Sequence, residues 1–258
     1  MTRLVLNAAE ASLDIVLGRD NDIICAQSWR VPHRGTEILV PALHGMLRQL
    51  GMRPADIGQM ACVCGPGSFT GVRLTLTTAA ALRRVCGMPL AGLDFMQALA
   101  LRGQRSSTPA AAGGWVWALT HARRDLVHCQ PFARGEEHLP PQALSPVELC
   151  SPANAARRMA DESPAGSVML GTGVQRNAHT LEMHCAAVPQ LASTAPLADD
   201  LWTLALHAAY AHTDIEPRYV RPCDAVENLD HIARKQGNDP AAAHARLDEL
   251  LHAPCAPV

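Results

Sequence analysis

The residues in this sequence best suited to chemistry form a glycine-rich loop from Gly65 to Arg73, which reads GPGSFTGVR. A strand-like apolar run precedes the loop and a helical pattern follows it. Glycines permit positive φ and close backbone approach, and the amides at a helix N-terminus form a natural anion site. The candidates for a phosphate or nucleotide loop are therefore Gly65, Gly67, Ser68, Thr70 and Gly71. Capping of the helix by Ser68 or Thr70 is the alternative, and the Gly-Lys-Ser/Thr end of a Walker loop is absent.

Histidines and cysteines are numerous but their spacing does not predict a metal site. None of the twelve histidines forms an H-x-x-x-H pair. Two pairs are five residues apart and do not share a helix face: His179 with His184, and His207 with His212. The nine cysteines include no C-x-x-C, so we expect buried free thiols in a reducing compartment. No G-x-S-x-G elbow suggests a serine protease.

The elements that position the glycine-rich loop follow from hydrophobic periodicity. Three short apolar runs with tight turns predict an antiparallel meander, and helices and strands then alternate, in the order β-β-β-α-β-α-β-α. The expected strands are Leu4–Leu6, Leu13–Leu17, Ile23–Trp29, Met60–Cys64 and Leu90–Leu93. The expected helices are Thr36–Leu50, Phe69–Cys86 and Phe95–Leu101.

The second half of the chain restates part of this pattern. It offers a hairpin, a helix, a strand with a glycine turn, and a helix: Trp115–Thr120 with Leu126–Phe132, Pro146–Glu162, Ser167–Leu170 with Gly171–Gly173, and Ala198–Ala211. Two related α/β halves that open with antiparallel strands predict the duplicated actin/Hsp70-type ATPase fold (ASKHA, ribonuclease H-like) with mixed sheets, rather than a Rossmann-like sheet. We expect an N-terminal subdomain over residues 1–101, a linker over 102–114, a smaller C-terminal subdomain over 115–221 and a peripheral tail over 222–258.

Read as a whole, the string from Gly65 to Arg73 resembles the GPGSFTGxR signature of the TsaB (YeaZ) family, which is Gcp-like and related to M22 glycoproteases. Four further segments are similar to that family in the same order: Gly87–Leu93, Ala122–Asp125, Gly171–Gly173 and Glu216–Arg221. The resemblance runs from Leu4 to about Arg221 and is densest between Cys64 and Leu93.

The chain departs from the family at both hairpin turns. Family members usually end the first strand with Asp-Thr or Asp-Ser, whereas Asn7 and Ala8 stand here, and Asn7 lacks the carboxylate that would hold magnesium's water shell. His121 takes the place of the usual Asp in the second hairpin, and Gly35 and Thr36 fall where a His-Ser pair is common. Because both turns have lost acidic groups, we expect no independent ATP hydrolysis.

The resemblance implies a non-catalytic scaffold and activator. Such a protein pairs with TsaD, the catalytic threonylcarbamoyltransferase, and with a TsaE-like ATPase in N6-threonylcarbamoyladenosine (t6A37) modification of tRNA. We expect no catalytic residue, no metal and no required cofactor, with ATP or ADP considered only at the partner interface. The formal net charge of -2 agrees with tRNA contact only through the complex, since direct RNA binding usually shows a basic excess.

The helix after the loop supplies the expected partner interface: Phe69, Val72, Arg73, Leu76, Thr77 and Ala80. Small residues permit close helix packing, and Val72, Leu76 and Ala80 share one face. Together with the helix over 36–50, this surface should form a two-fold homodimer when TsaD is absent. A Leu76→Glu variant should then remain a folded monomer. Packing of the same stripe inside its own domain is the alternative.

Two other functions remain open. One is a diverged interaction module of this fold without the tRNA-modification role. The other is a small-molecule kinase or carbamoyltransferase, which would need a metal-holding Asp in the first hairpin. The composition, 48% hydrophobic and 18% charged, is globular. Because Asn7, Glu10 and Asp14 interrupt the first apolar segment and no apolar run reaches membrane-spanning length, we expect a soluble cytoplasmic protein without membrane contact.

Overall fold

The computed structural model describes residues 1–30, 34–106, 113–220 and 229–252. It divides into two compact units, Met1–Arg218 and Tyr219–Val258. Among its described residues, the second unit contains the helices α9 (Leu229–Lys235) and α10 (Pro240–His252). All residues of the candidate site belong to the first unit.

The first sheet contains five strands in the order β3-β2-β1-β4-β5. Their bounds are β1 Thr2–Asn7, β2 Ser12–Arg19, β3 Asp22–Arg30, β4 Gln59–Gly65 and β5 Leu90–Asp94. β1, β2 and β3 pair antiparallel, while β4 pairs parallel with β1 and with β5. The predicted meander and the element order after it are confirmed.

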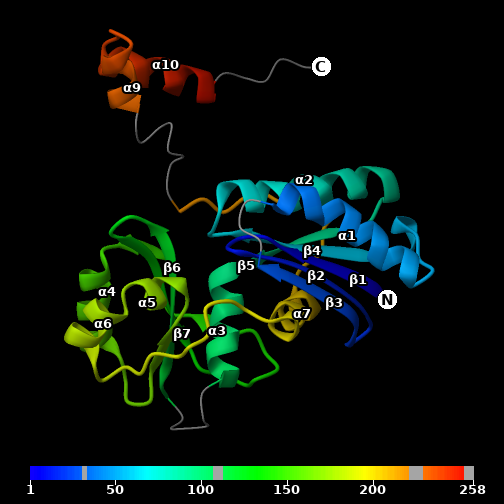
Figure 1. The fold of residues 1–258 in the computed structure, drawn as a ribbon, viewed down its shortest axis with the longest axis horizontal. Helices are drawn as coiled ribbons and strands as arrows, with labels where there is room; N and C mark the ends of the chain where they lie inside the picture. Colours follow the sequence, from blue (N-terminus) through cyan, green and yellow to red (C-terminus); the bar gives the residue numbers. More distant parts are fainter. Residues whose placement is uncertain (31–33, 107–112, 221–228, 253–258) are drawn as a thin grey trace. The chain divides into compact units, whose positions relative to one another are not determined.

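Helices cover both faces of this sheet (Figure 1). On one face lie α1 (Gly35–Gln49) and α2 (Phe69–Cys86), and on the other lie α3 (Phe95–Ser106) and α7 (Ala198–His207). A strand covered on both sides must be apolar on both sides, which is why Leu4, Val5 and Leu6 follow one another in β1 and are fully buried.

The second sheet repeats the plan in a smaller form. Its path is β10-β6-β7-β8, and β9 also pairs with β7. The bounds are β6 Trp115–Arg123, β7 Leu126–Ala133, β8 Gln142–Ala143, β9 Glu148–Cys150 and β10 Val168–Leu170. The core beneath α4 (Pro152–Glu162), α5 (Thr172–Arg176) and α6 (Ala178–Cys185) is separate from that of the first sheet. Helix α3 packs on β6 from the other side. The two related halves confirm the predicted duplicated actin/Hsp70-type fold.

Several predicted boundaries were wrong. The linker expected from residue 102 begins later, because α3 continues to Ser106; residues 107–112 lie outside the described residues. The helix expected from Pro146 begins at Pro152, capped by the Ser151 hydroxyl, because strand β9 precedes it. Helix α7 ends at His207 rather than at Ala211. Helix α6 was not anticipated.

The end of the first unit returns to the first sheet. Trp202 and other side chains of α7 join the core of this sheet, although residues 115–221 were expected to form a separate subdomain. Leu90 and Ala211 exchange backbone hydrogen bonds of 2.8 and 2.9 Å, and the Arg218 amide donates to the Cys64 carbonyl at 2.8 Å. We call the first sheet with α1, α2, α3 and α7 the first lobe, and the second sheet with α4, α5 and α6 the second lobe.

Candidate functional site

The glycine-rich loop lies where predicted, between the end of β4 at Gly65 and the start of α2 at Phe69. The Ser68 hydroxyl caps the helix by accepting a hydrogen bond from the Gly71 amide at 3.3 Å. Gly65 adopts φ +128°, and a side chain at this position would meet the carbonyl oxygen of Arg218 at 2.6 Å. Helix capping therefore explains the residue type at Ser68, and the close backbone contact explains the glycine at Gly65, without a bound phosphate.

The close approach that Gly67 and Gly71 permit is made by the turn between β1 and β2. A Cβ on Gly67 would lie 2.1 Å from the carbonyl oxygen of Ala9, and one on Gly71 would lie 1.9 Å from that of Ala8. The Ser68 amide donates a hydrogen bond to the same Ala9 oxygen. Carbonyl oxygens repel a phosphate, so an anion against these two glycines does not fit this structure. Thr70, the remaining loop candidate, is exposed in the first turn of α2.

The first hairpin keeps two carboxyl groups, which corrects the expectation that its acidic groups were lost. Asp14 lies directly opposite Asn7 across β1 and β2 and is buried. Its carboxylate accepts hydrogen bonds from Asn7 Nδ2 at 2.7 Å, from the Ser12 hydroxyl at 3.0 Å and from the Ser28 hydroxyl at 2.5 Å. The Asn7 Oδ1 accepts the Ala9 amide at 3.0 Å, so this side chain shapes the turn. A hollow of about 220 Å³ opens beside Asp14.

The second carboxyl group, that of Glu10, joins the two lobes. The Thr172 hydroxyl donates to Glu10 Oε1 at 2.8 Å and accepts the His121 amide at 2.9 Å. Burial raises the pKa of Glu10 to about 7, against the opposing effects of the Thr172 hydrogen bond and of Arg176. Burial and Arg176 lower the pKa of His121. Sequence reasoning identified His121 and the turn at Thr172 but gave Glu10 no role.

Helix α2 presents only part of its predicted interface to solvent. Val72 and Leu76 are 2% and 9% exposed and belong to the core of the first lobe, so the prediction that they share an outward face with Ala80 was wrong. The residues that face outward are Phe69, Arg73 and Thr77, with Ala80 half-buried at their edge. Phe69 is 44% exposed, and the Arg73 guanidinium lies 3.9 Å from the centre of its ring.

Helix α1 extends this outward surface. It lies beside α2 on the same face of the sheet (Figure 1), and Val40 in it is 59% exposed. We define the α1–α2 face as Val40, Phe69, Arg73 and Thr77. It includes two exposed apolar side chains and one cation, residue types that occur in protein–protein contact surfaces.

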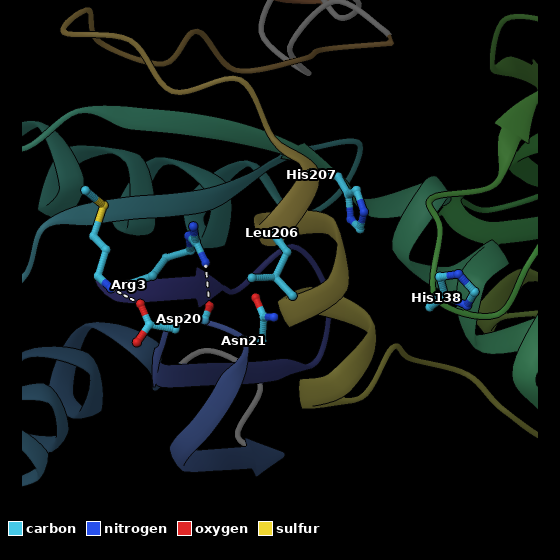
Figure 2. A pocket seen from close by; sticks show the side chains of 7 residues that line it. Arg3, Asp20, Asn21, His138, Leu206 and His207 are labelled. Carbon is cyan, nitrogen blue, oxygen red and sulfur yellow. Dashed lines mark hydrogen bonds and ion pairs between the residues drawn. The ribbon is translucent and has the colours of Figure 1, made fainter.

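A second hollow lies elsewhere, between β1, α7 and the loop after β7 (Figure 2). It measures about 580 Å³ and contains none of the predicted site residues. The Arg3 guanidinium at its wall lies 5.5 Å from the ring centres of both Trp202 and Tyr210 and donates to Gln59 at 3.1 Å. His138 and His207 stand on separate elements around it (Figure 2). Because the charge of Arg3 is engaged within the fold, we assign no chemistry to this hollow.

Within the described ranges, no group of three His, Cys, Asp or Glu side chains is placed to hold a metal ion. Of the cysteines described there, four are buried and three are half-buried, all as free thiols. Cys223 and Cys255 lie outside the described residues. None of the described helices is long and apolar enough to cross a membrane.

Comparison with known proteins identifies relatives of the chain. The family model described as "TsaD: tRNA N6-adenosine threonylcarbamoyltransferase" matches residues 32–167, just over half of the chain. The chain is 29% identical over 128 residues to the tRNA threonylcarbamoyladenosine biosynthesis protein TsaB of Bacillus subtilis, covering 50% of this chain and 53% of that protein. It is 26% identical over 136 residues to the Escherichia coli protein of the same name, covering 53% and 57% respectively. The matches thus span little more than half the length of these curated relatives.

A solved structure agrees over more of the chain. YeaZ from Pseudomonas aeruginosa superimposes with a TM-score of 0.68 and 22% identity, covering 85% of this chain and 99% of that one. Identity at this level shows a shared fold.

Proposed function

This chain belongs to the TsaD family, in its TsaB (YeaZ) group, and from that premise we propose that it is a non-catalytic partner of a TsaD-type threonylcarbamoyltransferase in t6A37 modification of tRNA. The observation that carries the proposal is the family match over residues 32–167. This range includes the glycine-rich loop and all of α1 and α2, but it does not include the first hairpin. The matched segment therefore includes every residue of the α1–α2 face.

The first hairpin supports a scaffold rather than a catalyst. The Asn7 amide is engaged by Asp14 and by the Ala9 amide, and the carbonyl groups of Ala8 and Ala9 fill the space beside Gly67 and Gly71. In this arrangement the loop packs against the turn at the N-terminus of α2. We infer that the loop has a structural role and stabilises the helix that carries the partner surface.

The α1–α2 face supplies the contact. Phe69 and Val40 offer exposed apolar area, and Arg73 offers a charge held in place over the Phe69 ring. Aromatic and arginine side chains are enriched among the residues that dominate binding energy. The TsaD-type protein has the same fold in this proposal, so the face meets a similar helix pair, and it meets a second copy of this chain when TsaD is absent. A TsaE-like ATPase and tRNA join through the complex.

Co-purification with the TsaD-type protein of the same cell tests this proposal. The variants Arg73→Glu and Thr77→Arg should abolish capture, because both change the charge of an exposed position without entering the core. Met183→Glu is the matched control, since Met183 is 64% exposed on α6 of the second lobe. Capture that survives both α2 variants, or that fails with Met183→Glu alone, would exclude the α1–α2 face.

A further inference from the structure

Two cysteines of the second lobe lie together on neighbouring strands. β7 and β9 pair antiparallel, with Val127 opposite Cys150 and Cys129 opposite Glu148. Residues two apart on a strand point to the same face, so Cys129 and Cys150 are diagonal neighbours on one face of the sheet. Cys150 also packs against the core of the second lobe that contains Cys129. We call these two residues the thiol pair.

The two thiols differ in access to solvent. Cys129 is 0% exposed in the core of the second lobe, whereas Cys150 is half-buried at the end of β9. The residue after Cys150 is Ser151, the N-cap of α4, so Cys150 lies at the positive end of an eleven-residue helix. Such a position stabilises a thiolate. Cys150 is therefore the thiol suited to react first with a reagent from solvent, and Cys129 is the thiol suited to attack the modified Cys150 afterwards.

Charged groups around the thiol pair come from α4 and β9. Arg158 of α4 is held by Glu162 at 2.9 Å and by Glu148 of β9 at 2.9 Å, and its guanidinium lies 5.3 Å from the ring centre of Trp117. The neighbouring Cys129 thiol, the Arg158 charge and the Ala155 amide lower the pKa of Cys150, while burial and Glu148 oppose them. The neighbouring Cys150 thiol and burial raise the pKa of Cys129.

From this arrangement we propose that Cys150 is a site of reversible thiol modification by small-molecule disulfides, and that Cys129 resolves the product into an internal Cys129–Cys150 disulfide. This inference concerns the second lobe and does not depend on the proposed partner role.

The exchange proceeds in two balanced steps. The Cys150 thiolate attacks one sulfur of a disulfide such as oxidised glutathione, forming a mixed disulfide and releasing one glutathione thiolate. Cys129 loses its proton to solvent and attacks the Cys150 sulfur, which releases the second glutathione. The chain is oxidised by two electrons and the small disulfide is reduced to two thiols. Diagonal residues are farther apart than directly opposed ones, so closure requires a shift of β9, a strand of only three residues.

Peptide-resolved mass spectrometry of the full chain, treated with oxidised glutathione, tests both steps. The wild-type chain should form the Cys129–Cys150 disulfide, and a Cys129→Ala variant should retain glutathione on Cys150. Cys25 and Cys86 are internal controls, because they too are half-buried free thiols. The proposal fails if either control reacts as fast as Cys150, or if glutathione stays on Cys150 in the wild-type chain.

Two variants that change the charges beside Cys150 provide a second test if Cys129→Ala does not fold. Glu148→Gln removes the opposing charge and should speed the reaction of Cys150 at neutral pH, while Arg158→Met removes the supporting charge and should slow it, each by about three-fold. In Glu148→Gln the lower pKa of Cys150 raises the fraction of thiolate, and this gain outweighs the smaller loss of nucleophilicity of each thiolate. Equal rates in both variants and the wild type would overturn the role of α4 and β9.

Discussion

The hydroxyl of Thr172 donates a hydrogen bond of 2.8 Å to the carboxylate of Glu10, which joins residues 162 positions apart in the chain. Through this contact the turn between β1 and β2 reaches the start of α5 in the second lobe. The carbonyl groups of Ala8 and Ala9 in the same turn lie against Gly71 and Gly67 at the start of α2. One turn thus connects the helix of the α1–α2 face with the second lobe.

Glu10 should make the stability of the chain depend on pH. Its pKa is raised from 4.5 to about 7 by burial, so the folded chain holds this proton more tightly than the unfolded chain does. Stability from this group is complete below pH 4.5 and is lost as the pH rises through about 7. The free energy of unfolding of the wild type, relative to Glu10→Gln, should fall by up to about 3 kcal/mol between pH 4.5 and pH 8.

Urea unfolding of both proteins at several pH values measures this difference. Glutamine keeps the size and the acceptor of the side chain, so the comparison isolates the ionisation. A difference that stays constant from pH 4.5 to pH 8 would show that Glu10 titrates as an ordinary exposed carboxyl group.

Gly67→Ala should destabilise the chain by about 2–3 kcal/mol, because its methyl group would overlap the carbonyl oxygen of Ala9. Gly45→Ala is the matched control: a Cβ at this helical position has nothing within 4 Å. The control should be stabilised by about 0.5–1 kcal/mol through helix propensity. Thermal unfolding followed by circular dichroism gives both values, and similar melting temperatures for the two variants would refute the contact between loop and turn.

Leu76→Glu should prevent folding, in contrast to the expectation from sequence that it would leave a folded monomer. Leu76 lies in the core of the first lobe, and an unpaired buried carboxylate costs about 4 kcal/mol or more. Thr77→Glu, one position along and exposed, should change stability by no more than about 0.5 kcal/mol. A folded, soluble Leu76→Glu protein with a wild-type melting temperature would place Leu76 outside the core.

The difference between these two positions shows where sequence reasoning failed. The larger apolar residues of helix α2 point in several directions, so no single apolar stripe marks the inward face: Phe69, Val72, Leu74, Leu76, Leu82 and Val85. Which side packs on the sheet depends on the neighbouring strands, and spacing within the helix does not report it. The existence of the helix and of the loop before it was predictable because glycine, serine and periodicity act locally.

Other features depend on contacts between distant parts of the chain. The Glu10–Thr172 contact has no local signal, and the diagonal placement of Cys129 and Cys150 depends on strand β9, which lay inside the helix predicted from Pro146. A signal for the true start of that helix was present, since Ser151 followed by Pro152 is a typical N-cap and first helical position.

Phe69→Glu should weaken self-association of the chain in the absence of a partner. The wild type should sediment as a dimer at micromolar concentration, and the variant should raise the dissociation constant at least about ten-fold, since a charge replaces an exposed apolar ring on the α1–α2 face. Met183→Glu should dimerise like the wild type. A wild-type chain that remains monomeric at high micromolar concentration would contradict the two-fold interface.

The central claim is tested most directly by measuring t6A in tRNA after reconstitution with the TsaD-type protein of the same cell, the TsaE-like ATPase and an activated threonylcarbamoyl donor. Nucleoside mass spectrometry should detect t6A only when this chain is added, and Arg73→Glu should abolish the product while Asn7→Ala, if folded, should leave t6A formation intact. Equal t6A yields with and without this chain would contradict the role proposed for it.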